Sequence, residues 1–180
     1  MTRKNTPTEQ IFNLSEHNVF ITFNPYSEST QKHIDAIING VNINGINSGI
    51  CAEIVTKYVK YNVFNPFRTA SGIIDLKDEN IEIKSSEFQI AEQYKDCKSL
   101  TAYLKRYYHD TPRTAFDIAL FNSDYTALHV WHFSKTQFVA FGKNYGKHKK
   151  GAIRFDGKKA RGRKLTLKGM REYISRYYTD

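Results

Sequence analysis

The most informative stretch of the sequence is Asp75-Leu76-Lys77-Asp78-Glu79-Asn80-Ile81-Glu82-Ile83-Lys84. Residues 73–77 and 81–85 are rich in β-branched side chains and are separated by polar turn formers, which predicts a β-hairpin over about 72–86. If the turn consists of Asp78 and Glu79, then Asp75 and Glu82 lie directly opposite each other, with Cβ atoms roughly 4.5–5.5 Å apart. Lys84 follows Glu82 by two residues and shares its face.

The two faces of this predicted hairpin differ in chemistry. The residues that alternate with the charged ones are all apolar: Ile74, Leu76, Ile81 and Ile83. That face suits a hydrophobic core, whereas neighbouring carboxylates on the other face repel each other unless a cation lies between them. Mg²⁺ prefers such oxygen ligands, and an adjacent lysine can orient an attacking water. A register shift of one residue would place Asp75 opposite Ile83 and remove the pairing.

A solvated hairpin with surface charges is the alternative. With 18 acidic residues and 18 lysines among 180, chance gives 18 × 18/180, or about two acid-x-lysine pairs, and the chain has four. They are Asp75/Lys77, Glu82/Lys84, Asp96/Lys98 and Asp156/Lys158. The pair at Glu82 differs from the others because it has the facing Asp75 and an apolar reverse face.

Asp75 followed by Glu82-Ile83-Lys84 resembles the catalytic signature of the PD-(D/E)XK nuclease superfamily, which includes most type II restriction endonucleases. The resemblance covers roughly residues 47–140 and departs from the motif at Ile74, where the family often has proline. It implies an α/β fold with a restriction-endonuclease-like core, in which helices flank a central mixed β-sheet. It also implies that Asp75 and Glu82 bind Mg²⁺, that Lys84 assists the attacking water, and that Ser85 and Ser86 contact DNA.

A helix before the hairpin often supplies a further glutamate in that family. Apolar residues recur at helical spacing from Ile50 to Val59, and Ser48 is a plausible N-cap, so an amphipathic helix is predicted to about Tyr61. Glu53 is the only acid in its segment 47–59, and the resemblance implies that it supports the metal site. The alternative is a solvated glutamate near the helix start, where an acid suits the helix dipole.

The remaining elements follow from apolar periodicity and turn residues. Residues 1–16 are expected to be irregular and 42–47 to form a loop. Strands are expected at 18–24, 116–121 and 126–133, the last two joined at Asn122-Ser123-Asp124. Helices are expected at 29–41, 91–108 and 167–178, with a short helix or turn at 134–139. Asp117 lies in an apolar strand and is either structural or close to the site, whereas His109, His129 and His132 lack partners at metal-ligand spacing.

Positive charge is concentrated near the C-terminus. The chain has a net charge of +9, but residues 143–171 hold 12 Lys and Arg and one acid, a net +11, which leaves −2 for the rest. Lysines and arginines between glycines are typical of contacts with a nucleic-acid backbone, although each run alone could be a solvated loop. The expected DNA-binding residues are Lys147, Lys149, Lys150, Lys158, Lys159, Arg161, Arg163 and Lys164. We divide the chain into a nuclease core, 1–142, and a basic extension with a terminal helix, 143–180.

Length and composition are compatible with one domain that has a sizeable core. No apolar run reaches the roughly 18 residues of a membrane span, and no secretory signal is evident. Two cysteines, Cys51 and Cys97, make neither a disulfide framework nor a zinc cluster, so a reducing cytoplasmic environment is expected.

These patterns together predict a Mg²⁺-dependent endonuclease that cuts double-stranded DNA at a short specific site, as type II restriction enzymes do. Cleavage of both strands of a palindrome implies a homodimer, because the symmetry of the site matches that of the protein. One alternative is a homing or junction-resolving nuclease of the same fold. The other is a DNA-binding protein without catalytic activity.

Overall fold

A computed structural model describes residues 5–24, 33–46, 48–65, 80–85, 115–148 and 165–178. Three predicted features lie outside these ranges: the first strand of the hairpin with Asp75, the helix at 91–108, and the basic segment after residue 148. The strand predicted to follow the turn is present as β5, Ile81–Ser85. Asn80, directly before it, has a left-handed φ of 54°, which suits a residue in a turn.

A four-stranded mixed sheet forms the centre of the fold, in the order β1-β7-β6-β5. The strands are β1 (Thr8–Asn13), β5, β6 (Ala115–Phe121) and β7 (Ala127–Ser134). β5 and β6 are parallel, and the other pairs are antiparallel. The two strands expected at 116–121 and 126–133 are therefore confirmed as β6 and β7, and the α/β class with a mixed sheet is also confirmed.

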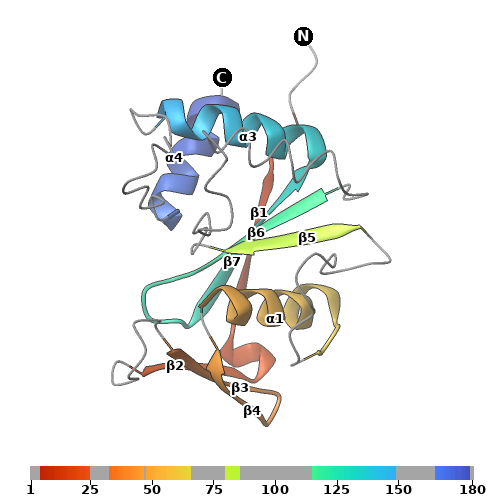
Figure 1. Cartoon of the computed structure of the whole chain (residues 1–180), viewed down its shortest axis with the longest axis vertical. Helices are drawn as coiled ribbons and strands as arrows, with labels where there is room; N and C mark the ends of the chain where they lie inside the picture. The colour runs from red at the N-terminus through yellow and green to blue at the C-terminus, as the bar shows by residue number, and fades with distance from the viewer. Residues whose placement is uncertain are drawn as a thin grey trace, which may run out of the picture.

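Helices cover both faces of this sheet (Figure 1). On one face lies α1, Ser48–Tyr61, which confirms the predicted amphipathic helix. On the other face lie α3 (Lys135–His148) and α4 (Leu167–Tyr178), the second of which was also expected. Each face has its own apolar core. Ile81, Ile83, Ala115 and Ala119 pack on the α1 side, while Phe116, Ile118, Trp131 and Phe133 pack on the side of α3 and α4.

A second sheet of three antiparallel strands lies on the α1 side of the molecule (Figure 1). It consists of β2 (Val19–Asn24), β3 (His33–Ile38) and β4 (Val41–Ile46). The helix predicted at 29–41 and the loop predicted at 42–47 are therefore wrong, whereas the strand at 18–24 is confirmed. Ile34, Ala36 and Ile38 alternate and are buried, which is the period of a strand.

The dipeptide Asn39-Gly40 explains this error. Both residues have positive φ, 49° and 80°, and Ile38 pairs with Val41 across them. A two-residue turn with two positive φ angles is the preferred hairpin connection, and Asn-Gly is its strongest sequence signal. The helix was predicted from the spacing of the isoleucines alone, which is compatible with both a helix and a strand.

β1 and the length of α3 also differ from expectation. Residues 8–13, expected to be irregular, form an edge strand because each of them pairs with a residue of β7, from Thr8 with His132 to Asn13 with Ala127. A 3₁₀ turn, Ser15–His17, follows it. The short helix or turn expected at 134–139 continues to His148, so the division proposed at residues 142/143 falls within α3.

Ser134 and Gln137 fix the start of α3 by a capping box. The Gln137 side chain accepts from the Ser134 backbone N–H at 2.7 Å, and the Gln137 backbone N–H donates to the Ser134 hydroxyl at 3.3 Å. α4 begins in a related way, with the Gly169 N–H donating to the Thr166 hydroxyl at 3.0 Å.

Candidate functional site

Glu82 and Lys84 form an ion pair on β5, the strand at one edge of the described sheet. Glu82 is only 4% exposed, and the Lys84 side chain is 20% exposed. Neighbouring residues of a strand point to opposite faces. Because Ile81 and Ile83 pack on the α1 side, Glu82 and Lys84 point to the other face, the one that carries Phe116.

A carboxylate removed from solvent stays charged only where cations or hydrogen-bond donors compensate it. Lys84 supplies one such cation from the same strand. The arrangement therefore holds an oxygen ligand and an ammonium group in contact, at a fixed spacing on a rigid element. These are the two groups that the acid-x-lysine pattern was expected to bring together.

Glu53 lies elsewhere in the fold. It belongs to α1, on the opposite side of the sheet from the Glu82 side chain, and it pairs at 3.0 Å with Lys57, one helical turn away. Lys57 is buried, so the Glu53 carboxylate balances a lysine that packs against the core. Asp75, the other predicted metal ligand, lies outside the described residues. The structure thus unites Glu82 with Lys84 and gives Glu53 a different partner.

A second polar cluster lies on the α1 face, around Asp117 of β6. The Asp117 side chain is fully buried. Its Oδ2 oxygen accepts two hydrogen bonds, one from Lys60 at 2.8 Å and one from the Tyr61 hydroxyl. Its other oxygen lies 2.8 Å from Nδ1 of His132, the cross-strand neighbour on β7. The cluster thereby connects the C-terminal end of α1 to two strands of the sheet.

Burial alone would raise the pKa of Asp117, but hydrogen bonds from His132, Lys60 and Tyr61 outweigh it, and the pKa is lowered. The carboxylate therefore stays ionised, which makes this cluster a candidate anchor for α1. The sequence marked Asp117 as an acid within an apolar strand. It gave no sign of its partners, because Lys60 and Tyr61 are 57 and 56 residues away.

A third polar contact joins β1, β7 and α4. Glu9 lies 2.8 Å from Nδ1 of His129 and 3.0 Å from the Arg171 guanidinium. His129 and His132 thus each have a carboxylate partner that sequence spacing did not reveal. Within the described ranges, no group of three or more His, Cys, Asp or Glu side chains is placed to hold a metal ion.

The predicted DNA contacts are only partly described. Ser85 ends β5 and pairs with Ala119 of β6. Lys147 lies in the last turn of α3. The others lie outside the described residues: Ser86, Lys149, Lys150, Lys158, Lys159, Arg161, Arg163 and Lys164.

No family model matches the chain, and no match was found among the curated proteins or the solved structures compared with it. Of the helices that the structure describes, none is long and apolar enough to cross a membrane.

Proposed function

We propose that this protein is a Mg²⁺-dependent endonuclease that hydrolyses phosphodiester bonds of double-stranded DNA at a short specific site, with the core of a PD-(D/E)XK restriction enzyme. The observation that carries the proposal is the ion pair on β5 between the buried Glu82 carboxylate and the partly buried Lys84 ammonium group. A buried carboxylate next to an ammonium group on a rigid strand has the chemistry of a phosphodiester-hydrolysing site.

The donor set fits a Mg²⁺ site in part. Glu82 offers the kind of oxygen ligand that Mg²⁺ prefers, and Asp75 is the second ligand of the proposal. Bound there, Mg²⁺ would polarise the scissile phosphate and lower the pKa of a water. Lys84 balances the charge on Glu82 and is close enough to hold an attacking water or to neutralise charge that develops on the phosphate.

Charge distribution supports a polyanionic substrate. The excess of positive charge is confined to residues 143–171, which have a net charge of +11. A polyanion would therefore be attracted to one region of the chain rather than to all of it. For a site that is palindromic, the protein acts as a homodimer. A homing or junction-resolving nuclease remains a second form of the proposal, and a branched or long-site substrate distinguishes it from cleavage of plain duplex.

The test is cleavage of a sequenced plasmid and a phage genome by the full chain, with Mg²⁺ or with EDTA. We expect discrete fragments only with Mg²⁺, and mapping their ends gives the recognition sequence. Lys84→Ala and Glu82→Gln should each reduce the cleavage rate by at least about 100-fold, the usual contribution of a catalytic proton-transfer or charge-stabilising group.

Lys98→Ala is the matched control, because it removes the lysine of another acid-x-lysine pair, Asp96/Lys98, and causes the same change in net charge. Its cleavage rate should equal that of the wild type. Wild-type protein that binds DNA but cuts none of these substrates would identify a binding protein instead. Normal cleavage by Lys84→Ala would mean that the site assignment is wrong.

A further inference from the structure

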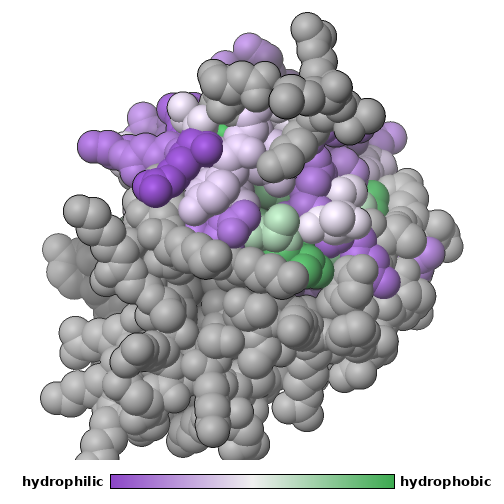
Figure 2. All heavy atoms as spheres, turned by 90° about the horizontal axis from the view of Figure 1, so that it is seen from above, coloured by the Kyte–Doolittle hydropathy of each residue, from purple (hydrophilic) through white to green (hydrophobic). Residues whose placement is uncertain are grey.

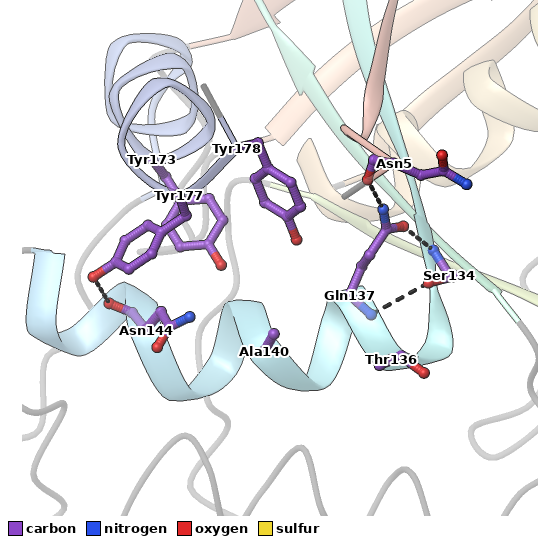
Figure 3. Close-up of a pocket in the computed structure, with 9 residues that line it drawn as sticks. All are labelled: Asn5, Ser134, Thr136, Gln137, Ala140, Asn144, Tyr173, Tyr177 and Tyr178. Atoms are coloured by element: carbon purple, nitrogen blue, oxygen red, sulfur yellow. Dashed lines mark hydrogen bonds between the residues drawn. The ribbon is translucent and has the colours of Figure 1, made fainter. Parts of the chain in front are cut away.

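A pocket of about 340 Å³ lies between α3 and α4, on the face of the sheet away from α1 (Figure 3). Its volume lies at the lower end of the range for pockets that bind small molecules, roughly 300–1,000 Å³. Three tyrosines from the last turns of α4 line one side: Tyr173, Tyr177 and Tyr178. Their rings project toward α3, where Ala140 faces them.

Contacts within the core hold the aromatic wall in place. Tyr173 is fully buried, and its ring meets the Phe141 ring edge-on, with centroids 4.9 Å apart. The Tyr177 ring lies against Tyr173 at 4.8 Å, and its hydroxyl donates to the Asn144 carbonyl at 3.3 Å. The wall is therefore formed before any ligand binds, and a ligand need not order it.

The opposite wall carries a few polar groups on α3. Gln137 is engaged in the cap of α3 and also donates to the Asn5 carbonyl, so its role is structural. Asn144 contributes an amide and Thr136 a hydroxyl, and each of these groups contains both a donor and an acceptor. An apolar, aromatic surface with one or two such groups suits a planar heterocycle that stacks on one side and forms hydrogen bonds at its edge.

The positive charge of the neighbouring segment of the sequence favours a heterocycle that belongs to a polyanion, as a nucleobase does. Residues 149–164, which connect α3 to α4, contain eight Lys and Arg and one Asp. Positive charge of this density would attract a polyanion such as a nucleic-acid strand. The described surface of this face is mostly hydrophilic, with a smaller apolar area among it (Figure 2).

We infer that the pocket between α3 and α4 binds a nucleobase of a DNA strand, which packs against the rings of Tyr177 and Tyr178. This inference rests on the proposed DNA substrate but not on cleavage, because the pocket and the ion pair of Glu82 are separate features. Stacking of a base on aromatic side chains tolerates any base, so the pocket would add affinity for strands with exposed bases rather than specificity.

The experiment compares two fluorescent single strands, oligo(dT) and an abasic strand of the same length, which have the same phosphates but differ in bases. Binding to the full chain is measured by anisotropy without Mg²⁺, so that no strand is cut. We expect oligo(dT) to bind about tenfold more tightly than the abasic strand, which is within the usual contribution of a stacked base.

Ala140→Leu fills the pocket from α3 with a residue of similar helix propensity and should remove the preference for oligo(dT). Val139→Leu is the matched control, because it adds a methylene at the adjacent position, which does not line the pocket. Tyr178→Leu tests the aromatic wall from α4 and should also remove the preference. Far-ultraviolet circular dichroism verifies that each variant is folded.

Two results would overturn the inference. One is equal binding of oligo(dT) and the abasic strand by the wild type. The other is a preference for oligo(dT) that persists in folded Ala140→Leu and Tyr178→Leu. If the two variants lose the preference for oligo(dT) but cut duplex DNA normally, the result supports base binding in the pocket and shows that cleavage does not depend on it. Conversely, a wild type that prefers oligo(dT) but never cuts DNA would contradict only the proposed endonuclease.

Discussion

Replacement of Asp117 by asparagine tests the polar cluster that connects α1 to the sheet. Asparagine has nearly the same shape but no charge, and its amide nitrogen is a donor where Asp117 has an acceptor. In the folded protein, the Asp117 side chain is fully buried and accepts from Lys60, Tyr61 and His132. The variant therefore leaves a nearly buried lysine without its counter-ion and brings donors face to face.

The magnitude follows from these contacts. Removal of one partner of a buried ion pair costs about 3–5 kcal/mol. The His132 side chain is 46% exposed, so solvent screens its contact and it adds little. Because the asparagine oxygen still accepts one hydrogen bond, we expect a loss near the lower limit, about 3 kcal/mol. In a chain of this length, that loss lowers Tm by about 6–12 °C.

The difference in free energy of unfolding between wild type and Asp117→Asn should depend on pH in a defined direction. The pKa of Asp117 is lowered in the folded protein, below its ordinary value of 3.8. A lowered carboxyl pKa contributes stability that is complete above the unfolded-state pKa and is lost as the pH falls through the folded-state pKa. The free energy of unfolding of the wild type should therefore exceed that of the variant by a constant amount between about pH 7 and pH 5. This difference should shrink below about pH 4.

Trp131 makes the measurement direct. It is the only tryptophan in the chain, is 1% exposed and lies on β7 next to His132, so its fluorescence reports unfolding close to the cluster. Urea unfolding of wild type and Asp117→Asn gives the free energy difference at each pH, provided that the m-value is unchanged. Glu16→Gln, which removes a carboxylate charge from an exposed position, is the control and should leave stability nearly unchanged. Equal midpoints for wild type and Asp117→Asn at pH 7 would refute the reasoning.

Burial raises the pKa of the Cys51 thiol to about 12. In a Cys97→Ser background, the folded protein should therefore resist iodoacetamide at pH 8 and react once urea unfolds it. Rapid alkylation of the folded chain would contradict the burial. Ser134→Ala removes the hydroxyl that caps α3 and should cost about 1 kcal/mol in urea unfolding, and an unchanged midpoint would mean that the cap contributes nothing. Burial would raise the pKa of Glu9, but hydrogen bonds from Arg171 and His129 hold it below the ordinary value, so Arg171→Ala should raise it in a ¹³C NMR titration, and an unchanged carboxyl titration would argue against the contact.

Local patterns in the sequence predicted those elements whose signals do not compete. The helix at 48–61 has an apolar stripe and a start residue, and β6 and β7 are apolar runs separated by a polar turn, so each was predicted close to its bounds. The segment 33–46 contains isoleucines compatible with two periods, and there the Asn39-Gly40 turn was decisive. β1 has no strong pattern of its own and is a strand because β7 provides its backbone partners.

For the candidate site too, the sequence predicted the contact within one element and not the contacts between elements. Spacing along one strand determined that Glu82 and Lys84 share a face, because side chains of a strand alternate. Spacing did not determine on which face of the sheet α1 packs, and that choice separates Glu53 from Glu82. Nor did it reveal that Asp117 meets Lys60, Tyr61 and His132, which come from two other elements.

The sequence by itself therefore determined the local elements, the acid-lysine pair and the concentration of positive charge after residue 142. Only the tertiary structure decided which side chains from different elements meet, including the pocket between α3 and α4. The physical reason is that periodicity describes the faces of one element, whereas contacts between elements depend on how those faces pack to bury apolar surface.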